Sequence, residues 1–262
     1  MIFYFSGTGN TRWAAEAVAR ALGEPLIAIA DAADGDCHYS LSAGERIGIF
    51  FPVHGWRPPH IVRRFIRRLH IADAEGHYCY ALATCGDSVG RAMQLLRDDL
   101  AVAGIRLDST FSLIMPESYV ALPFMYTDSP ERERQKKAQA RADLDRYLPH
   151  ITNRDTCLEL LHRGYAPWIY TFVIGAYFNA RLITDRPFVV DPERCVGCRK
   201  CETVCPVKNV VNGADDSKRF LPAWLHDGRC TTCLACYHYC PHHAIDYRKA
   251  ITKNRGQYYF KE

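Results

Sequence analysis

Two cysteine runs in the last third of the chain constrain its fold more than any other feature. The first, CVGCRKCETVCP, begins at Cys195, and the second, CTTCLACYHYCP, begins at Cys230. Both read C-x2-C-x2-C-x3-C-P, so each cysteine of the second run follows its counterpart at the same interval. Short steps of this kind wrap a chain around one compact metal group, and the longer step with its proline turns the fourth sulfur away.

The spacing of these cysteines favours iron–sulfur clusters over zinc and over disulfides. Eight of the 12 cysteines lie in the two runs, and the other four are scattered through the chain. In a reducing compartment, such density is better explained by metal than by disulfides. Structural zinc is the alternative, but a zinc site uses two Cys-x-x-Cys pairs separated by a loop. Two runs of three cysteines plus one, each closed by proline, are instead typical of 4Fe–4S proteins.

The first 150 residues alternate apolar runs with amphipathic stretches. This alternation predicts an α/β fold with a doubly wound parallel sheet of five strands, covered by helices on both faces. The expected strands are 2–6, 25–30, 46–52, 78–84 and 109–115, and the expected helices are 10–22, 60–70, 89–103 and 128–148. We expect three regions: a sheet domain over 1–150, a mostly helical connecting segment over 151–187, and a cysteine-rich domain over 188–262.

A glycine-rich turn, SGTGNT at 6–11, follows the first expected strand and opens the first helix. Backbone N–H groups and the positive end of a helix dipole hold phosphate at such a position. Gly7 and Gly9 allow the backbone to approach closely, and the hydroxyl side chains around them add donors. The motif is neither GxxxxGKS/T nor a full GxGxxG, so an ATPase loop and a dinucleotide fingerprint both fit poorly.

In the order and type of their elements, residues 1–150 resemble a flavodoxin. SGTGNT matches the FMN phosphate loop, PVHGW (52–56) follows the third strand, and TCGDS (84–88) follows the fourth. The resemblance implies the strand order 2-1-3-4-5, with the ligand at the switch point between the first and third strands. It implies the following FMN-binding residues: Ser6, Gly7, Thr8, Gly9, Asn10, Thr11, Pro52, Val53, His54, Gly55, Trp56, Thr84, Cys85, Gly86 and Asp87.

This sequence departs from the flavodoxin pattern beside the flavin ring. Flavodoxins usually place aromatic side chains on both flanking loops, but TCGDS contains neither Tyr nor Trp. Trp56 is the one obvious candidate for stacking on the flavin ring. The alternative is that Trp56 is a partly buried loop residue without contact to a flavin. Tyr119, His54 and Cys85 are further candidates for contact with the flavin ring. The alternative is that they are ordinary packing or loop residues.

Residues 188–248 resemble a bacterial ferredoxin with two 4Fe–4S clusters, which implies a small α+β domain. By this resemblance, one cluster is bound by Cys195, Cys198, Cys201 and Cys240. The other is bound by Cys205, Cys230, Cys233 and Cys236. Together, the two halves resemble the flavodoxin–ferredoxin fusion proteins.

The net charge gives no reason to expect a nucleic-acid partner. The formal value of +4 treats every cysteine as a neutral thiol. Each cluster with four thiolates carries about −2 when oxidised, and the phosphate of FMN adds about −2, so the loaded protein is close to −2. A local basic row remains in HIVRRFIRRLH (60–70), where the arginines form a solvated face or steer an acidic redox partner.

We expect no membrane span, because the longest apolar stretch falls short of the about 20 residues that one requires. Met1 leads directly into a strand-like run without a basic flank, so no signal peptide is expected and the expected compartment is the cytoplasm. The aromatic stretch 165–178 is expected to be a helix that docks the two domains. A substrate-facing lid and a membrane-surface contact are the alternatives.

The sequence therefore predicts an electron-transfer protein of anaerobic metabolism that passes electrons between two 4Fe–4S clusters and FMN. It would serve as a carrier or reductase component for a redox protein, such as a ferredoxin or a reductase. One alternative is an FMN-dependent reductase of a small organic substrate, and another is a redox sensor with structural clusters. No acid/base constellation stands out, so no catalytic residue is assigned and enzymatic activity as a ferredoxin-linked oxidoreductase stays open.

Overall fold

Contacts between residues divide the chain into two units, each built from separate stretches of sequence. The structure, a computed structural model, describes residues 1–213, 219–248, 252 and 255–261. Unit 1 contains Met1–Ser6, Asn10–Pro116 and Pro130–Ala180. Unit 2 contains Gly7–Gly9, Glu117–Ser129 and Arg181–Glu262. The two units are groups of residues in contact, whereas the expected regions 1–150, 151–187 and 188–262 are stretches of sequence that would fold as domains. The expected boundaries at 150 and 187 therefore stay a prediction.

Unit 1 is built on a six-stranded sheet whose neighbouring strands are all parallel, in the order β2-β1-β4-β6-β7-β8. The strands are β1 (Ile2–Tyr4), β2 (Leu26–Ala28), β4 (Ile47–Pro52), β6 (Cys79–Cys85), β7 (Ser109–Ile114) and β8 (Glu159–Leu160). The first five places of this order are the expected 2-1-3-4-5 arrangement. The doubly wound flavodoxin-like fold is therefore confirmed.

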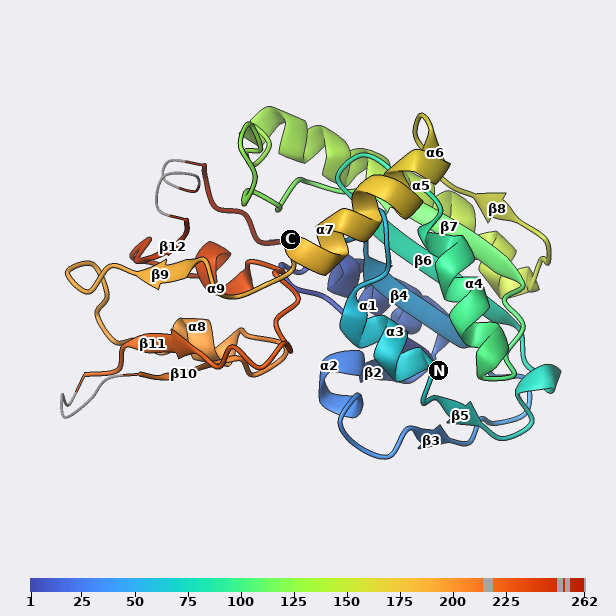
Figure 1. Cartoon of the computed structure of the whole chain (residues 1–262). Helices are drawn as coiled ribbons and strands as arrows, with labels where there is room; N and C mark the ends of the chain where they lie inside the picture. Colours follow the sequence, from blue (N-terminus) through green and yellow to red (C-terminus); the bar gives the residue numbers. More distant parts are fainter. Residues whose placement is uncertain (214–218, 249–251, 253–254, 262) are drawn as a thin grey trace. The chain divides into compact units, whose positions relative to one another are not determined.

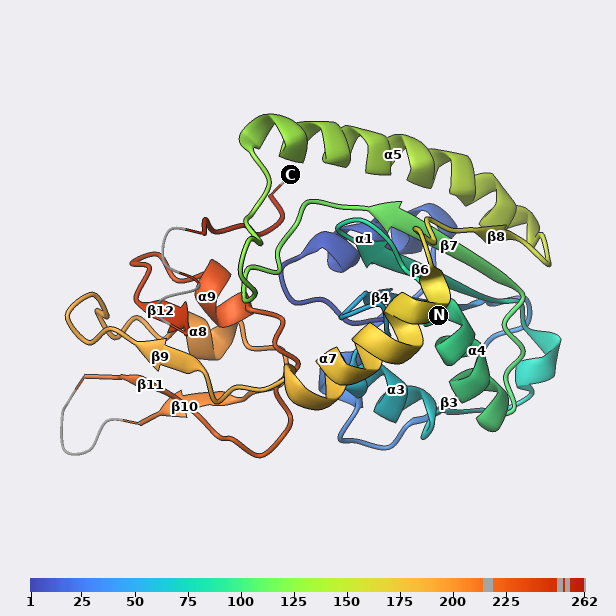
Figure 2. The same cartoon turned by 45° about the horizontal axis from the view of Figure 1, so that its top comes forward.

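Helices cover both faces of this sheet (Figure 1, Figure 2). One face carries α1 (Asn10–Leu22) and α5 (Pro130–Asn153), and the other carries α3 (His60–Ile66) and α4 (Ala92–Val102). Because neither face meets water, β4 and β6 are apolar along most of their length and are buried, with no alternation of polar and apolar residues.

The ends of two helices differ from the expectation. Helix α3 stops at Ile66, because β5 (His70–Ile71) pairs in parallel with β3 (His38–Tyr39) instead of continuing the helix. Helix α5 continues through Pro149 to Asn153. The fully buried side chain of Ile151 anchors this last turn. Two short elements complete this part of unit 1, namely α2 (Ile29–Ala32) and the 3-10 turn η1 (Ala74–Gly76).

The segment after α5 adds a strand and an interrupted helix. Strand β8 is too short to show a period-2 pattern, so no sequence signal marks it. The expected aromatic helix is present as α6 (Pro167–Ile169), a π-helical turn η2 (Tyr170–Ile174) and α7 (Gly175–Arg181). No helix among the described residues is both long and apolar enough to cross a membrane.

The arginine row at 63–68, on α3 and just after its end, makes ion pairs and hydrogen bonds within unit 1. Arg63 pairs with the buried carboxylate of Asp99 through two hydrogen bonds, and Arg67 Nε lies 2.8 Å from the same carboxylate. Arg64 pairs with Asp34, and the guanidinium of Arg68 donates to the carbonyls of Ala33 and Gly35. Arg64, Arg67 and Arg68 are nevertheless exposed, so the row is a solvated face, as one of the two interpretations expected, and its charges are partly paired.

Unit 2 contains two copies of one backbone motif. The first copy carries α8 (Lys200–Thr203) and β10 (Val210–Asn212), and the second carries α9 (Ala235–His238) and β12 (Ile245–Tyr247). Left-handed φ angles recur at matching places, at Arg199 and Leu234 before the helices. They recur again at Lys208 and His243 after the fourth cysteine of each run. The sequence repeat is thus a repeat of backbone conformation.

Two antiparallel pairs join these copies: β9 (Phe188–Val190) with β12, and β10 with β11 (Pro222–Trp224). Between them lies a core that includes Phe188, Trp224, Leu234 and Tyr247. Val120 and Ala121 from the stretch Glu117–Ser129 join the same core. The small ferredoxin-like α+β region is confirmed.

Candidate functional site

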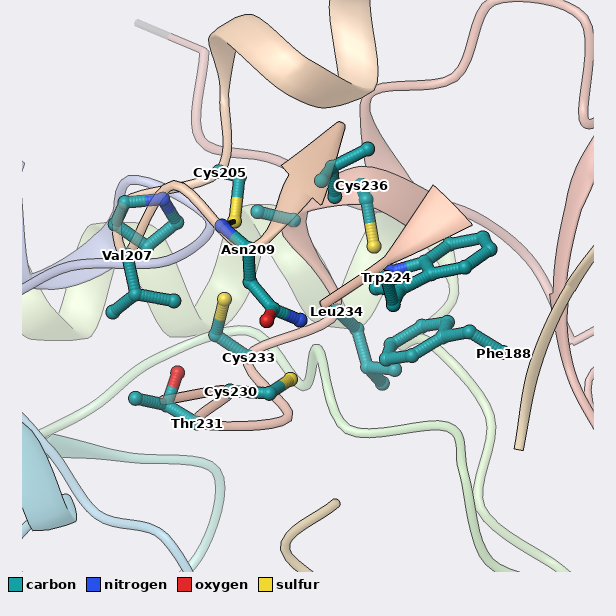
Figure 3. Close-up of a pocket in the computed structure, with 13 residues that line it drawn as sticks. Phe188, Cys205, Val207, Asn209, Trp224, Cys230, Thr231, Cys233, Leu234 and Cys236 are labelled. Atoms are coloured by element: carbon teal, nitrogen blue, oxygen red, sulfur yellow. Dashed lines mark hydrogen bonds between the residues drawn. The ribbon is translucent and has the colours of Figure 1, made fainter. Parts of the chain in front are cut away.

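Four cysteines of unit 2 surround one cavity. It is lined by Cys205, Cys230, Cys233 and Cys236, together with side chains that include Asn209, Thr231, Trp224 and Phe188. Figure 3 shows these four side chains entering from different sides with their sulfurs toward the shared space. The Cys236 thiol interacts electrostatically with the other three thiols. The structure thus brings Cys205 of the first run together with three cysteines of the second.

Hydrogen-bond donors are arranged around these sulfurs. The backbone N–H of Asn209 donates to Cys205 Sγ at 3.2 Å, and that of Thr232 donates to Cys230 Sγ at 3.4 Å. Trp224 Nε1 and Thr231 Oγ1 are buried and have no hydrogen-bond partner of standard geometry among the described residues. Both nevertheless lie close enough to a thiol to lower its pKa, Trp224 at Cys236 and Thr231 at Cys233.

This donor set fits an anionic iron–sulfur cluster. Hydrogen bonds to thiolate and sulfide sulfurs stabilise the negative charge of such a cluster and tune its potential. The amide oxygen of Asn209, Oδ1, is also buried and has no hydrogen-bond partner among the described residues. It can only accept hydrogen bonds, so it would not stabilise an anionic cluster. Within the same residues, no three His, Cys, Asp or Glu side chains converge on a single ion position.

Burial keeps the free thiols protonated. It raises the pKa of Cys230 to about 12 and that of Cys233 to about 11. The pKa of Cys236 is also raised, well above its usual value. Ligation requires the thiolate form, so metal binding must displace these protons.

The second group of cysteines is more open. Burial raises the pKa of the Cys201 thiol to about 12, and the thiols of Cys240 and Cys195 contribute to this rise. The N–H of Ala244 donates to Cys240 Sγ at 3.3 Å, which repeats the bond of Asn209 to Cys205 in the other copy. Cys198 is exposed. The structure thus brings three of the four implied ligands together and leaves Cys198 at the surface.

The tip of the glycine-rich turn, Gly7–Gly9, belongs to unit 2. A Cβ added at Gly7 would stand 2.6 Å from the Cβ of Cys233. At Gly9, where φ is +100°, an added Cβ would stand 2.9 Å from the Cβ of Phe260. The N–H of Phe260 donates to the carbonyl of Thr8 at 2.7 Å. A larger residue at Gly7 or Gly9 would therefore clash with atoms of Cys233 or Phe260, so both positions require glycine.

In unit 1, the predicted flavin loops meet at the carboxyl edge of the sheet. Thr11 Oγ1 and Thr84 Oγ1 share a hydrogen bond of 2.7 Å, and the N–H of Val53 donates to the carbonyl of Thr84 at 2.8 Å. Asn10 Nδ2 donates to the carbonyl of Pro116, just beyond β7. Of the remaining predicted residues there, Asp87 is exposed, while the carbonyl of Gly86 accepts from Lys136 Nζ.

The candidates for ring contact already have partners within the protein. Trp56 lies against Tyr170, with ring centroids 4.6 Å apart, and its Nε1 donates to Ser88 Oγ. Cys85 is buried and its thiol is directed to the carbonyl of Leu113. His54 lies edge-on to Phe5, and Tyr119 packs against the core of unit 2. Their contact with a flavin stays a prediction.

Sequence reasoning missed the residues that support these loops. The Thr171 hydroxyl donates to the carbonyl of Trp56 and accepts from the N–H of Arg91. Asn179 Nδ2 donates to the carbonyl of His54. In unit 2, Asp185 accepts from Asn209 and His226. These are isolated polar residues without a repeating pattern, so only their long-range contacts reveal them.

Comparison with known proteins supports the iron–sulfur assignment. The family model of the 4Fe-4S dicluster domain matches residues 194–245. Among curated proteins, a component of the ion-translocating oxidoreductase complex of Methanosarcina acetivorans is 43% identical over 54 residues. This match covers 21% of the chain and only 18% of that relative.

The solved structures that resemble this chain include flavoproteins, at low overall similarity. A putative flavoprotein from Bacteroides uniformis is 22% identical, with a TM-score of 0.33 over 43% of this chain and 88% of that one. A flavodoxin from Streptococcus pneumonia TIGR4 is 15% identical, with a TM-score of 0.30 over 55% and 96%. TM-scores this low do not establish a shared fold, so the fold assignment rests on the strand order.

The strand order and the cysteine sets define an iron–sulfur protein with a flavodoxin-like sheet unit. The chain has the architecture of a flavodoxin–ferredoxin fusion, with its 4Fe–4S domain over 194–245.

Proposed function

We propose that this protein transfers electrons between two 4Fe–4S clusters and FMN, as a carrier or reductase component for a redox partner protein. When bound, the clusters exchange single electrons and the flavin exchanges one or two. Cys195, Cys198, Cys201 and Cys240 hold one cluster, and Cys205, Cys230, Cys233 and Cys236 hold the other. Residues 6–11, 52–56 and 84–87 hold FMN.

The observation that carries this proposal is the cavity formed by Cys205 with Cys230, Cys233 and Cys236. A fourth ligand taken from the other run is what two interlocked cubanes require. Buried donors, Trp224 Nε1 among them, are already in place for an anionic group. Such an arrangement would hold a cluster in a fixed position, which suits rapid electron exchange with little reorganisation.

The glycine-rich turn supports the flavin part of the proposal. Residues 6–11 lead into the N-terminus of α1, a helix of 13 residues, where a phosphate is stabilised by N–H groups and the helix dipole. In the strand order, β1 and β4 flank the switch point at which doubly wound sheets bind their ligands. The tip of the same turn contacts Cys233.

An anaerobic reductive titration of the loaded protein tests the proposal. Flavin absorbance, the EPR signals of reduced clusters, the extracted flavin and the bound iron are all measured. We expect FMN as the extracted flavin, iron for two clusters, and flavin that becomes reduced by electrons supplied to the clusters by a low-potential protein donor. A Cys205→Ser variant should slow this reduction at least about tenfold, while dithionite still reduces its flavin directly.

Two outcomes would replace the proposal with an alternative. Flavin that stays oxidised while the clusters are reduced, at potentials that reach the flavin couple, indicates a sensor with structural clusters. Rapid turnover of a small organic acceptor without any second protein indicates a reductase rather than a carrier.

A further inference from the structure

The helix Pro167–Arg181, made of α6, η2 and α7, exposes apolar and aromatic side chains and buries polar ones. Between Tyr165 and Ala180, every exposed position carries an apolar or aromatic residue. Tyr165 is 91% exposed, Trp168 54%, Val173 53% and Tyr177 64%. A surface helix of a globular protein normally turns its charged and polar residues to water. We call the exposed residues Tyr165, Trp168, Ile169, Val173, Ile174 and Tyr177 the outer face.

The inner side of the helix explains why this face points outward. Thr171 and Asn179 are buried, and their side chains hydrogen-bond to the backbone of Trp56 and His54. Arg57 Nε donates in turn to the carbonyl of Thr171. A Cβ at Gly175 would overlap the carbonyl oxygen of Gly55, so the helix backbone lies directly on this loop. The orientation is therefore fixed by contacts and does not result from loose packing.

The charges in the stretch of chain that carries the outer face are one-sided. The stretch from Leu160 to Thr184 contains no Asp or Glu, and it carries Arg163 before the helix and Arg181 at its end. Arg163 pairs with Glu159, which also pairs with Arg97, so this group of three side chains keeps a net positive charge. A protein partner would present an uneven pattern of charges, whereas an anionic bilayer presents a uniformly negative surface.

The chemistry of the outer face also matches a bilayer interface. Trp and Tyr have an apolar ring and a polar tip, and they concentrate where hydrocarbon meets headgroups. Ile169, Val173 and Ile174 supply aliphatic area between them. A helix with such a face and basic ends lies in the plane of the membrane surface without crossing it.

We propose that the outer face binds the surface of a membrane containing anionic lipids, with Arg163 and Arg181 at the headgroups. This peripheral contact does not depend on the proposed electron-transfer function.

Vesicle co-sedimentation of the loaded protein tests this binding, with vesicles of phosphatidylcholine alone and of phosphatidylcholine mixed with phosphatidylglycerol. We expect binding to the mixed vesicles that weakens as salt is added. The fluorescence of Trp168 should shift to shorter wavelength and be quenched by brominated lipid, and a Trp168→Phe variant should lose that change.

A matched pair of variants locates the contact. Val173→Glu should weaken binding to the mixed vesicles about tenfold or more, because it removes buried apolar area and adds a negative charge. Val102→Glu makes the same change at the end of α4, at a residue 77% exposed and outside the outer face, and should bind as the unchanged protein does. Circular dichroism checks that both variants are folded.

Three results would overturn the proposal. The first is the absence of binding to either kind of vesicle. The second is binding that Val173→Glu and Val102→Glu weaken equally. The third is a concentration-dependent dimer that Val173→Glu abolishes while vesicle binding is unchanged, since the outer face would then be an interface between copies of this chain.

Discussion

In the proposed assignment, Cys205 and Cys240 are the residues at which each cysteine run serves the opposite site. Cys205 faces the cavity made by the second run, and Cys240 interacts with Cys201 of the first. The two sulfurs accept equivalent hydrogen bonds, because the backbone N–H groups of Asn209 and Ala244 donate to them from matching positions in the two copies. In the proposed assignment, neither run therefore completes a four-thiolate site by itself.

Replacing either exchanged cysteine should damage the site of the other run. We expect Cys240→Ser to disturb the cluster that begins at Cys195, and Cys205→Ser to disturb the one that begins at Cys230. Iron analysis and EPR of the two variants check this, with the exposed and scattered Cys157→Ser as the control. If each variant instead lost the cluster of its own run, the interlocked assignment would be wrong.

Trp224 is expected to tune the buried cluster. Its ring stacks on Phe188 at 5.1 Å, which aims the buried Nε1 at Cys236. Trp224→Phe keeps an aromatic ring but removes the N–H donor. Hydrogen bonds to sulfur stabilise the more negative reduced state, so the potential of this cluster should become lower.

An EPR-monitored redox titration measures that shift. Tyr247→Phe is the matched control, because Tyr247 also packs on Phe188, while its hydroxyl donates to the carbonyls of Leu182 and Thr184. An equal shift in both variants would mean that packing on Phe188, and not the indole N–H, sets the potential.

At the scale of elements, three short stretches of unit 2 are joined by one carboxylate. Asp185, before β9, accepts from Asn209 before β10 and from the N–H and ring of His226 after β11. Burial alone would raise the pKa of Asp185, but the hydrogen bonds from His226 and Asn209 outweigh it and hold the pKa below 3.8. The ionised form is therefore favoured in the folded protein.

This carboxylate should stabilise unit 2 in a pH-dependent way. A lowered folded pKa contributes stability that is present above the unfolded value of 3.8 and is lost as the pH falls through the folded value. Asp185→Asn should cost about 2 kcal/mol at neutral pH and less below 3.8. Tyr247 and Cys230 also interact with Asp185.

Thermal unfolding followed by circular dichroism, above and below that pH, measures the effect. The difference between Asp185→Asn and the unchanged protein isolates this group from the acid sensitivity of any cluster. A difference that stays constant with pH would show that the Asp185 charge contributes nothing.

At the scale of the whole molecule, the last 82 residues do not contain all of unit 2, which also takes Gly7–Gly9 and Glu117–Ser129. His238 shows what the second stretch supplies. It is fully buried, its Nε2 donates to the carbonyl of Ser118 at 2.6 Å, and its Nδ1 accepts from the N–H of Tyr258. Burial lowers the pKa of His238 to about 4, so the neutral ring makes both bonds.

A fragment of residues 181–262 should therefore be less stable than the same residues in the full chain. It lacks the Ser118 acceptor and the buried side chains of Val120 and Ala121, a loss of about 3 kcal/mol. Iron content and thermal unfolding of the fragment check this, with the peptide 117–129 added back as the control. A fragment that holds its clusters as firmly as the full chain would show that residues 181–262 form a separable domain.

The sequence by itself determined the class of sheet and the class of metal group. Both depend on local spacing: near-continuous apolar runs such as β4 and β6 define a sheet buried on both faces, and the C-x2-C-x2-C-x3-C-P runs define 4Fe–4S sites. The strand order came from the resemblance to flavodoxins, and the sheet confirms it. The number and exchange of the cysteine sets came from the resemblance to ferredoxins, and the structure places Cys205 accordingly.

Only the tertiary structure decided what the polar and aromatic residues between these motifs do. The aromatic helix could be expected from its composition, but which side faces outward depends on Thr171 and Asn179 meeting a loop more than a hundred residues earlier. The same is true of Asp185, of Trp224 and of the contact between Gly7 and Cys233. Hydrogen bonds and close packing over such separations leave no periodic trace in a sequence, because they depend on where the folded chain brings single residues together.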